Sequence, residues 1–498
     1  MKTKRSALNF VSDVIPLLII SILGIFKLKL FIQILGNETL GLYQLFSQIM
    51  VYVALVDGGL TSAVLYSLYK PNANNDENKM SEILSAAKKA FSFIGMIVFF
   101  IAFVVSFFIQ YFIKDFSFNI WYIRLLFMLF SLSNVVSYFF VPYQVLLEVK
   151  EKKYLVNICL QTGQILLSVL EIIMLLNSMS FFKILIMHAI VKLISNIAIY
   201  FFCKKNVDNV TFTSQDKDYS FKNNIKHLLV HKVNGLIGSN IDIVIISSFL
   251  GLEYVAIYSV YNYIINMIKT IVGKLSSSIV AIIGNKNAEN VEEGYKVYQE
   301  MNSLLFFVAI IICVPLVLAI NSFIDIWYEG TINTSLLIAV SFVSLLYVFI
   351  IKLSSTTFVT SAGLFKETEK CAFLDMSINL VLSLILVNYL GIAGVILATT
   401  FSTFISEYIL KTIVLFKNNF KKEAKYFFLN NIKYFILTMV VLFIGHIIIS
   451  NIIIPTILNW FLIFLIYTLL NTFLVLGCFY LFKDLNFLKR IKYLLRRA

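Results

Sequence analysis

The sequence predicts an all-α polytopic membrane protein with about fourteen transmembrane helices. Hydrophobic residues make up 60% of the 498 positions and charged residues only 14%, whereas a soluble domain is about 25% charged. Apolar runs of about 20 residues recur along the chain and lack the alternation of barrel strands. A helix satisfies its own backbone hydrogen bonds in lipid. We therefore expect helices throughout and no soluble domain of any size.

Fourteen apolar runs are long enough to cross a membrane. From the N-terminus, the expected helices lie at residues 10–34, 40–69, 90–113, 120–147, 154–176, 181–203, 226–249, 253–281, 300–320, 334–361, 372–389, 391–414, 432–453 and 457–481. Pro16, Pro142 and Pro315 fall inside three of these runs. Since proline removes a helical hydrogen bond, these are the candidate bends.

The basic residues predict the orientation of these helices. Of the 41 lysines and arginines, 31 lie near the two termini and in every second connection, while the other connections hold only Lys114. Because cytoplasmic loops carry the excess of positive charge, both termini are expected in the cytoplasm. Basic residues in these cytoplasmic segments account for the net charge of +14. No nucleic acid is therefore expected as a partner.

The sequence contains no pattern typical of an enzyme or a metalloprotein. The expected external loops are too short for a catalytic domain, and no Ser-His-Asp arrangement, P-loop or glycine-rich nucleotide motif appears. The five cysteines lack CxxC spacing, and His227 and His231 have no acidic partner nearby. We therefore predict no enzymatic activity, catalytic residue, cofactor or metal site.

An internal repeat divides the chain. LGNETLGLYQLF begins at Leu35, and a similar stretch, LGLEYVAIYSVY, begins at Leu250. Both follow the first helix of a half, which predicts parallel repeats around a cavity; chance similarity of two apolar turns is the alternative. The predicted parts are an N-terminal six-helix lobe (1–207), a cytoplasmic linker (208–225), a second six-helix lobe (226–415) and two extra helices with a basic cytoplasmic tail (416–498).

Nine basic residues remain inside the predicted helices once the connections are counted. They are Lys27, Lys29, Arg124, Lys183, Lys192, Lys232, Lys269, Lys274 and Lys352. Each would cost roughly 2.5–3.5 kcal/mol at a helix centre, so most should face a wet cavity or a partner. Such a cationic column fits an anionic, phosphate-bearing substrate.

Some of these lysines have simpler explanations. Lys183 and Lys274 lie close enough to helix ends for their ammonium groups to reach the interface. Lys27 can form a structural ion pair with Asp57 of the next helix. Lys269 has no acidic residue near it in sequence, which favours a place in a cavity.

The acidic residues inside helices leave two alternatives open. Asp242 can pair with Lys232 or Lys269, or act as an ion-coupling site. Glu171 and Glu407 can be proton or cation sites, or they can form hydrogen bonds between neighbouring helices.

Four stretches carry a resemblance to a known family. They are LGNETLGLYQLFSQIMVYVALVDGGLTSAVL at 35–65, HKVNGLIGSNIDIVIISSFLGLEYVAIYSVYNYI at 231–264, FIDIWYEG at 323–330 and NLVLSLILVNYLGIAGVILATTFST at 379–403. In these stretches the chain resembles the bacterial polysaccharide repeat-unit exporters and flippases of the multidrug/oligosaccharidyl-lipid/polysaccharide exporter superfamily.

The resemblance implies two six-helix lobes around a V-shaped cavity, plus two further helices. It also implies transport of an undecaprenyl-pyrophosphate-linked oligosaccharide to the external leaflet, for a capsule or an O-antigen-like surface polysaccharide. In such proteins helices 1, 2, 7 and 8 border the cavity. Related lipid II flippases have basic residues in helices 1, 2 and 8, whereas helix 2 of this chain carries Asp57. This difference argues against lipid II itself as the substrate.

Together these observations predict a flippase that works by alternating access in the bacterial plasma membrane. The expected substrate-binding residues are Lys27, Lys29, Asp57, Lys232, Lys269 and Arg124. Asp57 and Asp242 are the candidate coupling sites for a proton or sodium gradient, and the membrane potential is the other energy source. The expected partners are the anionic lipid-linked oligosaccharide and membrane lipids, with polysaccharide polymerases and glycosyltransferases as further candidates.

Three rival functions can be compared with the sequence. A multidrug antiporter of the same superfamily would need a net-acidic cavity for cationic drugs. A membrane-embedded polysaccharide polymerase would need a large loop or paired carboxylates near a surface. A non-transporting scaffold of a glycan assembly complex is the third.

Overall fold

The computed structural model describes residues 2–114, 117–207, 210–221, 241–449 and 456–485, with backbone only for 2–15 and 275–289. The described chain is all-helical, as predicted, and its described residues form no strand. It divides into two compact units, Met1–Ala256 and Ile257–Ala498. Each unit is described by itself below.

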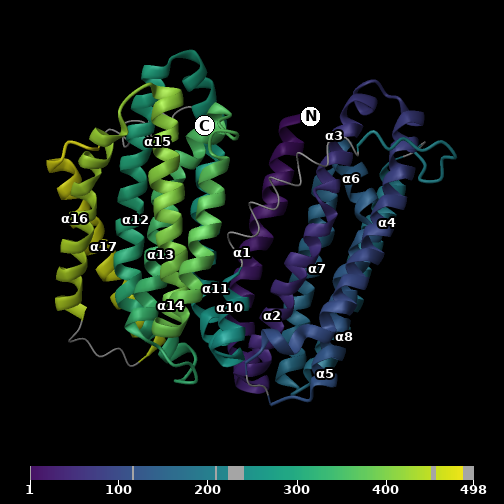
Figure 1. The fold of residues 1–498 in the computed structure, drawn as a ribbon, viewed down its shortest axis with the longest axis horizontal. Helices are drawn as coiled ribbons and strands as arrows, with labels where there is room; N and C mark the ends of the chain where they lie inside the picture. The colour runs from purple at the N-terminus through teal and green to yellow at the C-terminus, as the bar shows by residue number, and fades with distance from the viewer. Residues whose placement is uncertain (1, 115–116, 208–209, 222–240, 450–455, 486–498) are drawn as a thin grey trace. The chain divides into compact units, whose positions relative to one another are not determined.

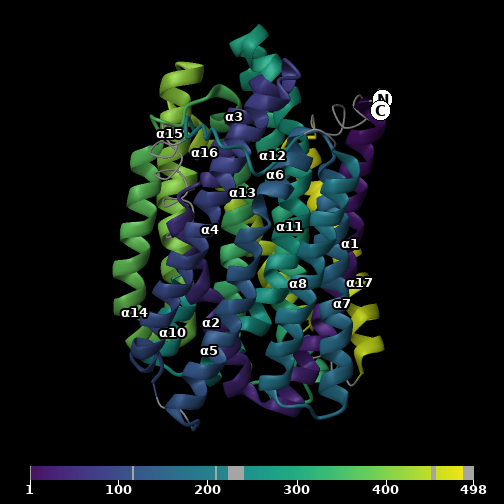
Figure 2. The same cartoon turned by 90° about the vertical axis from the view of Figure 1, so that its right-hand side faces the viewer.

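The first unit holds the elements up to the start of α11. They are α1 (Lys2–Leu35), α2 (Asn37–Val53), η1 (Ala54–Asp57), α3 (Leu60–Ala73), α4 (Glu77–Phe108), η2 (Ile109–Phe112), α5 (Ile120–Val135), η3 (Val136–Phe139), α6 (Val141–Val149), α7 (Lys153–Leu176), α8 (Phe181–Asn206) and α10 (Asp242–Phe249). Within it, α1 packs along α7, α7 against α8, α8 against α5, and α5 against α4 and α2. Figures 1 and 2 both show α1, α7 and α8 running side by side.

The boundary between the units falls within α11. The remaining elements are α11 (Leu252–Glu289), α12 (Val291–Trp327), α13 (Leu336–Ala362), α14 (Glu369–Thr403), η4 (Phe404–Leu410), α15 (Lys411–Leu415), η5 (Phe416–Phe420), α16 (Ala424–Ile449) and α17 (Ile457–Leu481). Helix α12 packs against α13, α16 and α17. The Trp460 Nε1–H of α17 donates to the Ala319 carbonyl of α12 at 2.8 Å.

Twelve of the described helical segments are long and apolar enough to cross a membrane. One of them, Glu369–Phe420, has 52 residues and contains the two expected helices 372–389 and 391–414. Gly391 has a φ of 57° and separates its two parts. The Thr399 hydroxyl then donates to Asn379 at 3.2 Å, 20 residues back, so the chain reverses there. The expected helix 226–249 lies mostly outside the described residues.

The expected continuous helix 40–69 was wrong, because the chain breaks at the sequence VDGG. Helix α2 tightens into the 3₁₀ turn η1, and α3 begins only at Leu60. Gly58 and Gly59 have φ values of 56° and 82°, which a residue with a side chain rarely adopts. The Gly59 N–H donates to Asp57 Oδ1 at 3.0 Å. The carboxylate thus binds a backbone donor that the helix break leaves without a helical partner.

The expected helix 120–147 is broken in the same way. The 3₁₀ turn η3 separates α5 from α6, and Pro142 lies in the first turn of α6, where its missing N–H is harmless. By contrast, α1 and α12 continue through Pro16 and Pro315. Both breaks, η1 and η3, pack against α4.

The described part of the linker, residues 210–221, lies against the beginning of α4. The backbone N–H groups of Thr211 and Ser214 donate to the hydroxyls of Ser81 and Ser85, at 3.0 and 2.9 Å. Phe221 is fully buried at the end of this segment. The polar connection is therefore attached to the first unit along this stretch.

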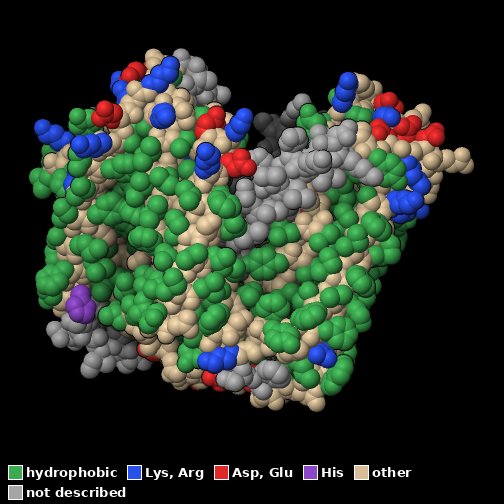
Figure 3. Space-filling view, viewed as in Figure 1, with side chains coloured by type: hydrophobic (Ala, Val, Ile, Leu, Met, Phe, Trp, Pro, Cys, Tyr) green, Lys and Arg blue, Asp and Glu red, His purple; other side chains and the backbone are tan. Residues whose placement is uncertain are grey.

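The described surface is apolar along the helices. On the face that Figure 3 shows, hydrophobic side chains cover the middle of the helices of each unit, and Lys, Arg, Asp and Glu gather near the helix ends. Exposed apolar side chains include Phe100, Phe201, Phe443 and Phe473, each at least 60% accessible. In water such a surface would drive aggregation, whereas lipid tails cover it. The chain is a multi-pass membrane protein.

Candidate functional site

A buried ion-paired cluster occupies the interior of the first unit. Lys27 Nζ of α1 lies 2.9 Å from Glu171 Oε2 of α7, and His188 Nε2 of α8 lies 2.7 Å from the other oxygen, Oε1. Glu171 is 1% exposed and His188 5%. An ionised carboxylate only accepts hydrogen bonds, so the Nε2 atom of His188 carries the proton that it shares with Glu171.

Aromatic residues surround this cluster. The Tyr43 ring of α2 meets the His188 ring edge-to-face with centroids 6.0 Å apart, and it meets Phe130 and Phe181 in the same manner. Edge-to-face pairs fix the orientation of rings. The aromatic rings thus help to hold the imidazole in place beside Glu171.

The polar groups continue along α8 beyond the cluster. His188, Lys192 and Asn196 follow each other at a spacing of four residues, which places them on one face of the helix. Lys192 Nζ donates to Asn134 Oδ1 of α5 at 2.8 Å. Asn196 is 2% exposed and donates to Ser137 Oγ of η3 at 3.2 Å. We call the face formed by His188, Lys192 and Asn196 the α8 polar face.

A second cluster of charges lies in the second unit. Glu407 Oε2 is 2.5 Å from Lys411 Nζ and 3.9 Å from Lys352 Nζ. Lys352 and Lys269 also approach the Phe349 ring, with Nζ atoms 6.0 and 5.6 Å from its centroid. Glu407 lies in η4, a π-helix, and such segments often occur at functional sites. The second unit thus brings Lys269 of α11 and Lys352 of α13 to one aromatic ring.

The other predicted site residues have different surroundings. Arg124 donates to Gln110 Oε1 at 3.0 Å, and its guanidinium lies 4.6 Å from the centroid of the exposed Trp121 ring. Trp and Arg in this arrangement are typical of a membrane interface. Lys29 is half-buried on α1.

Two further predicted residues lie at or beyond the start of α10. Asp242 is 4% exposed in the first turn of α10, where a carboxylate interacts favourably with the helix dipole. Lys232 lies outside the described residues.

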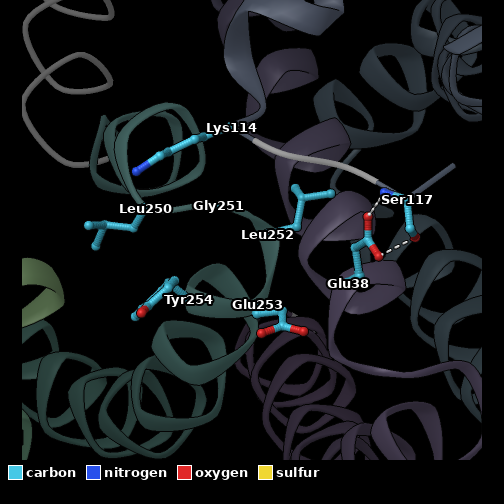
Figure 4. Close-up of a pocket in the computed structure, with 8 residues that line it drawn as sticks. All are labelled: Glu38, Lys114, Ser117, Leu250, Gly251, Leu252, Glu253 and Tyr254. Atoms are coloured by element: carbon cyan, nitrogen blue, oxygen red, sulfur yellow. Dashed lines mark hydrogen bonds between the residues drawn. The ribbon is translucent and has the colours of Figure 1, made fainter.

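The two repeated turns meet inside the first unit. A Cβ at Gly41 would overlap the backbone of Leu252, so α2 and the start of α11 touch backbone to backbone. Beside this contact is an open pocket of about 410 Å³, lined by residues that include Glu38, Lys114 and Glu253. Figure 4 shows Glu38 turned toward Ser117, whose N–H donates to it at 2.8 Å. Glu38 and Glu253 occupy equivalent positions of the repeat.

Sequence reasoning missed the pairing of Lys27 with Glu171 and His188. A usable signal was present in the distances from the helix ends. Lys27 comes eight residues before the end of α1, Glu171 five before the end of α7, and His188 seven after the start of α8. These separations correspond to similar depths at 1.5 Å per residue. No group of three or more His, Cys, Asp and Glu suited to a metal ion occurs in the described part of the chain.

Comparison with known proteins finds similar folds among solved structures. No protein-family model and no curated protein sequence matches the chain. The solved structure of the lipid II flippase MurJ in an inward closed conformation matches with a TM-score of 0.74 at 16% identity, over 96% of this chain and 99% of that one.

Solved structures of MOP superfamily transporters are also similar to the structure of this chain. An inward-facing multidrug resistance MATE transporter matches with a TM-score of 0.62 at 15% identity, covering 82% of this chain and 98% of that one. A MOP superfamily transporter from Pyrococcus furiosus matches with a TM-score of 0.53 at 15% identity, covering 83% and 96%. The chain therefore has the fold that the lipid II flippase and the MOP superfamily transporters share.

Proposed function

We propose that this protein moves an undecaprenyl-pyrophosphate-linked oligosaccharide from the cytoplasmic to the external leaflet of the bacterial plasma membrane, by alternating access, for surface polysaccharide synthesis. The observation that carries the proposal is the match to a lipid II flippase over nearly the full length of both chains. The residues inside the membrane support the choice of substrate.

Lysines inside membrane helices support a pyrophosphate-bearing substrate. Lys27 in the first unit and Lys269 in the second are half-buried on helices α1 and α11. Ammonium groups at such depth are expensive in lipid and are favourable where they meet phosphate oxygens. In this proposal Lys27 and Lys269 are each a candidate contact for the pyrophosphate, and Glu171 neutralises Lys27 when no substrate is bound.

The same proposal assigns roles to the other predicted residues. Lys29, Lys232, Asp57 and Arg124 stay candidates for contacts with the transported molecule, and Asp57 and Asp242 stay candidates for ion coupling.

Both termini lie in the cytoplasm in this proposal. The sequence-based division into parts at 1–207, 226–415 and 416–498 and a linker at 208–225 belongs to the same proposal.

Reconstitution into liposomes tests the proposal. A fluorescent undecaprenyl-pyrophosphate-linked sugar should cross the bilayer in vesicles with wild-type protein. Lys27→Gln and Lys269→Gln should each slow the crossing by on the order of tenfold, since each removes a charge-assisted hydrogen bond. The exposed Lys366 offers a matched control, and Lys366→Gln should leave the rate unchanged.

The main alternative is a multidrug antiporter, which the match to a MATE transporter favours. In the described interior the carboxylates Glu171 and Glu407 already bind lysines, so neither offers a vacant partner to a cationic drug. Ethidium efflux in the same vesicles separates the two functions. Efflux without movement of the lipid-linked sugar would establish the antiporter and refute the flippase.

A further inference from the structure

Lys192 binds a neutral side chain, whereas three other lysines in helices bind carboxylates. Lys27 pairs with Glu171, and Lys352 and Lys411 with Glu407. Lys192 instead binds the neutral amide oxygen of Asn134, and no carboxylate pairs with it among the described residues. Among the described residues of the first unit, its positive charge therefore has no carboxylate partner.

Lys192 and the side chains that contact Asn196, its neighbour on the α8 polar face, provide spare hydrogen-bond donors. An ammonium has three N–H donors, and one of them is used on Asn134. Gln144 donates one N–H to Asn196 Oδ1 at 3.3 Å and has a second N–H available. The Ser137 hydroxyl accepts from Asn196 at 3.2 Å, which leaves its own O–H available to donate. A cluster with surplus donors, in which no described residue supplies a carboxylate, is suited to an oxyanion.

The chain that packs against α8 is broken between α5 and α6. This break is a separate observation in favour of a ligand. Ser137 lies in η3 and Gln144 in α6, on the two sides of the interruption that follows α5. Non-helical backbone at membrane depth is tolerated where it is buried in protein or lines a cavity, and transporters bind substrates at such broken helices. The break therefore places polar side chains from three segments on the α8 polar face, with Asn134 against Lys192 and with Ser137 and Gln144 against Asn196.

We propose that Lys192, with Ser137 and Gln144, forms an oxyanion subsite of the first unit, distinct from the ion-paired Lys27. This inference rests on the proposed function, because the transported molecule supplies the oxyanion. The group is either a phosphate of the pyrophosphate linkage or the carboxylate of an acidic sugar in the oligosaccharide. Asn134 and Asn196 act as positioning residues that hold the lysine and the amide of Gln144.

Binding to the purified full-length protein in nanodiscs tests the subsite. The probes are undecaprenyl pyrophosphate, a disaccharide containing glucuronic acid and the same disaccharide with neutral glucose. Lys192→Gln should weaken binding of one anionic probe by on the order of tenfold and leave the neutral disaccharide unchanged. Weakened pyrophosphate binding assigns the subsite to the linkage, and weakened glucuronate binding assigns it to the sugar.

Two further variants separate binding from folding. Lys192→Arg keeps the charge and should restore binding to within about threefold of wild type. Lys183, on the same helix, is exposed, so Lys183→Gln should bind all probes normally. If Lys192→Gln binds both anionic probes as wild type does, the subsite is refuted while the proposed function stands. If wild-type protein binds neither anionic probe, the proposed function fails and the subsite with it.

Discussion

At the scale of single residues, Glu171 organises the interior of the first unit. It accepts from both Lys27 and His188 and is itself almost inaccessible. Two acceptor oxygens thus satisfy two donors from different helices. A buried carboxylate is tolerated only when paired and hydrogen-bonded in this way.

Replacing Glu171 by alanine should destabilise the protein strongly. Lys27 and His188 would lose their shared partner, and breaking a buried pair from one side costs about 3–5 kcal/mol. Glu171→Gln should cost less, because the amide oxygen still accepts a hydrogen bond from one partner. Denaturant titration in mixed micelles would measure the free energy of unfolding.

The matched control for this prediction is Glu253→Ala. Glu253 is exposed and lies in the same unit, so its removal should change the free energy of unfolding by less than about 0.5 kcal/mol. A Glu171→Ala protein as stable as the Glu253→Ala protein would show that the buried cluster contributes nothing to the fold.

At the scale of elements, hydrophobicity predicted where helices lie but not where they break. The apolar run from 40 to 69 continues across Asp57, Gly58 and Gly59, so its length alone indicated one helix. The break depends on two consecutive glycines with positive φ, which hydrophobic periodicity does not register. The π-helical turn that holds Glu407 also leaves no compositional signal.

The linker provides a pH-dependent prediction at this scale. Burial alone would raise the pKa of Asp218, but hydrogen bonds from Ser220 and the ammonium of Lys79 outweigh it and lower that pKa. The Asp218 and Lys79 side chains approach to 3.1 Å. Because the folded pKa is lowered, this contribution to docking is present above about pH 4 and is lost as the pH falls through the lowered value.

A spin label at the exposed position Thr213 would report this docking. Label mobility should rise when the pH is lowered from about 6 to about 3. Lys79→Met should raise mobility already at pH 6, whereas Lys217→Met, at an exposed lysine without an ion pair among the described residues, should not. Equal mobility of all three proteins at both pH values would contradict the docking role of the pair.

At the scale of the whole molecule, the sequence predicted the fold class from composition and the transporter fold from its motifs. The structural match to the lipid II flippase and the MATE transporter confirms the fold. The partners of the interior charges were not predictable in the same way. Pairing depends on the depth and rotation of α1, α7 and α8, and a shift of one residue turns a side chain by 100° around its helix.

Recognition of the pyrophosphate is tested most directly by two lipids that differ only in the group linking the sugar to undecaprenol. The same fluorescent oligosaccharide would be linked to undecaprenol through a pyrophosphate or through an uncharged ether, and its movement would be followed in vesicles with wild-type protein. We expect the pyrophosphate-linked lipid to move at least about tenfold faster than the ether-linked lipid, the factor expected for one charge-assisted contact. Equal rates for the two lipids would contradict it, because the lysines inside the membrane would then have no part in recognising the substrate.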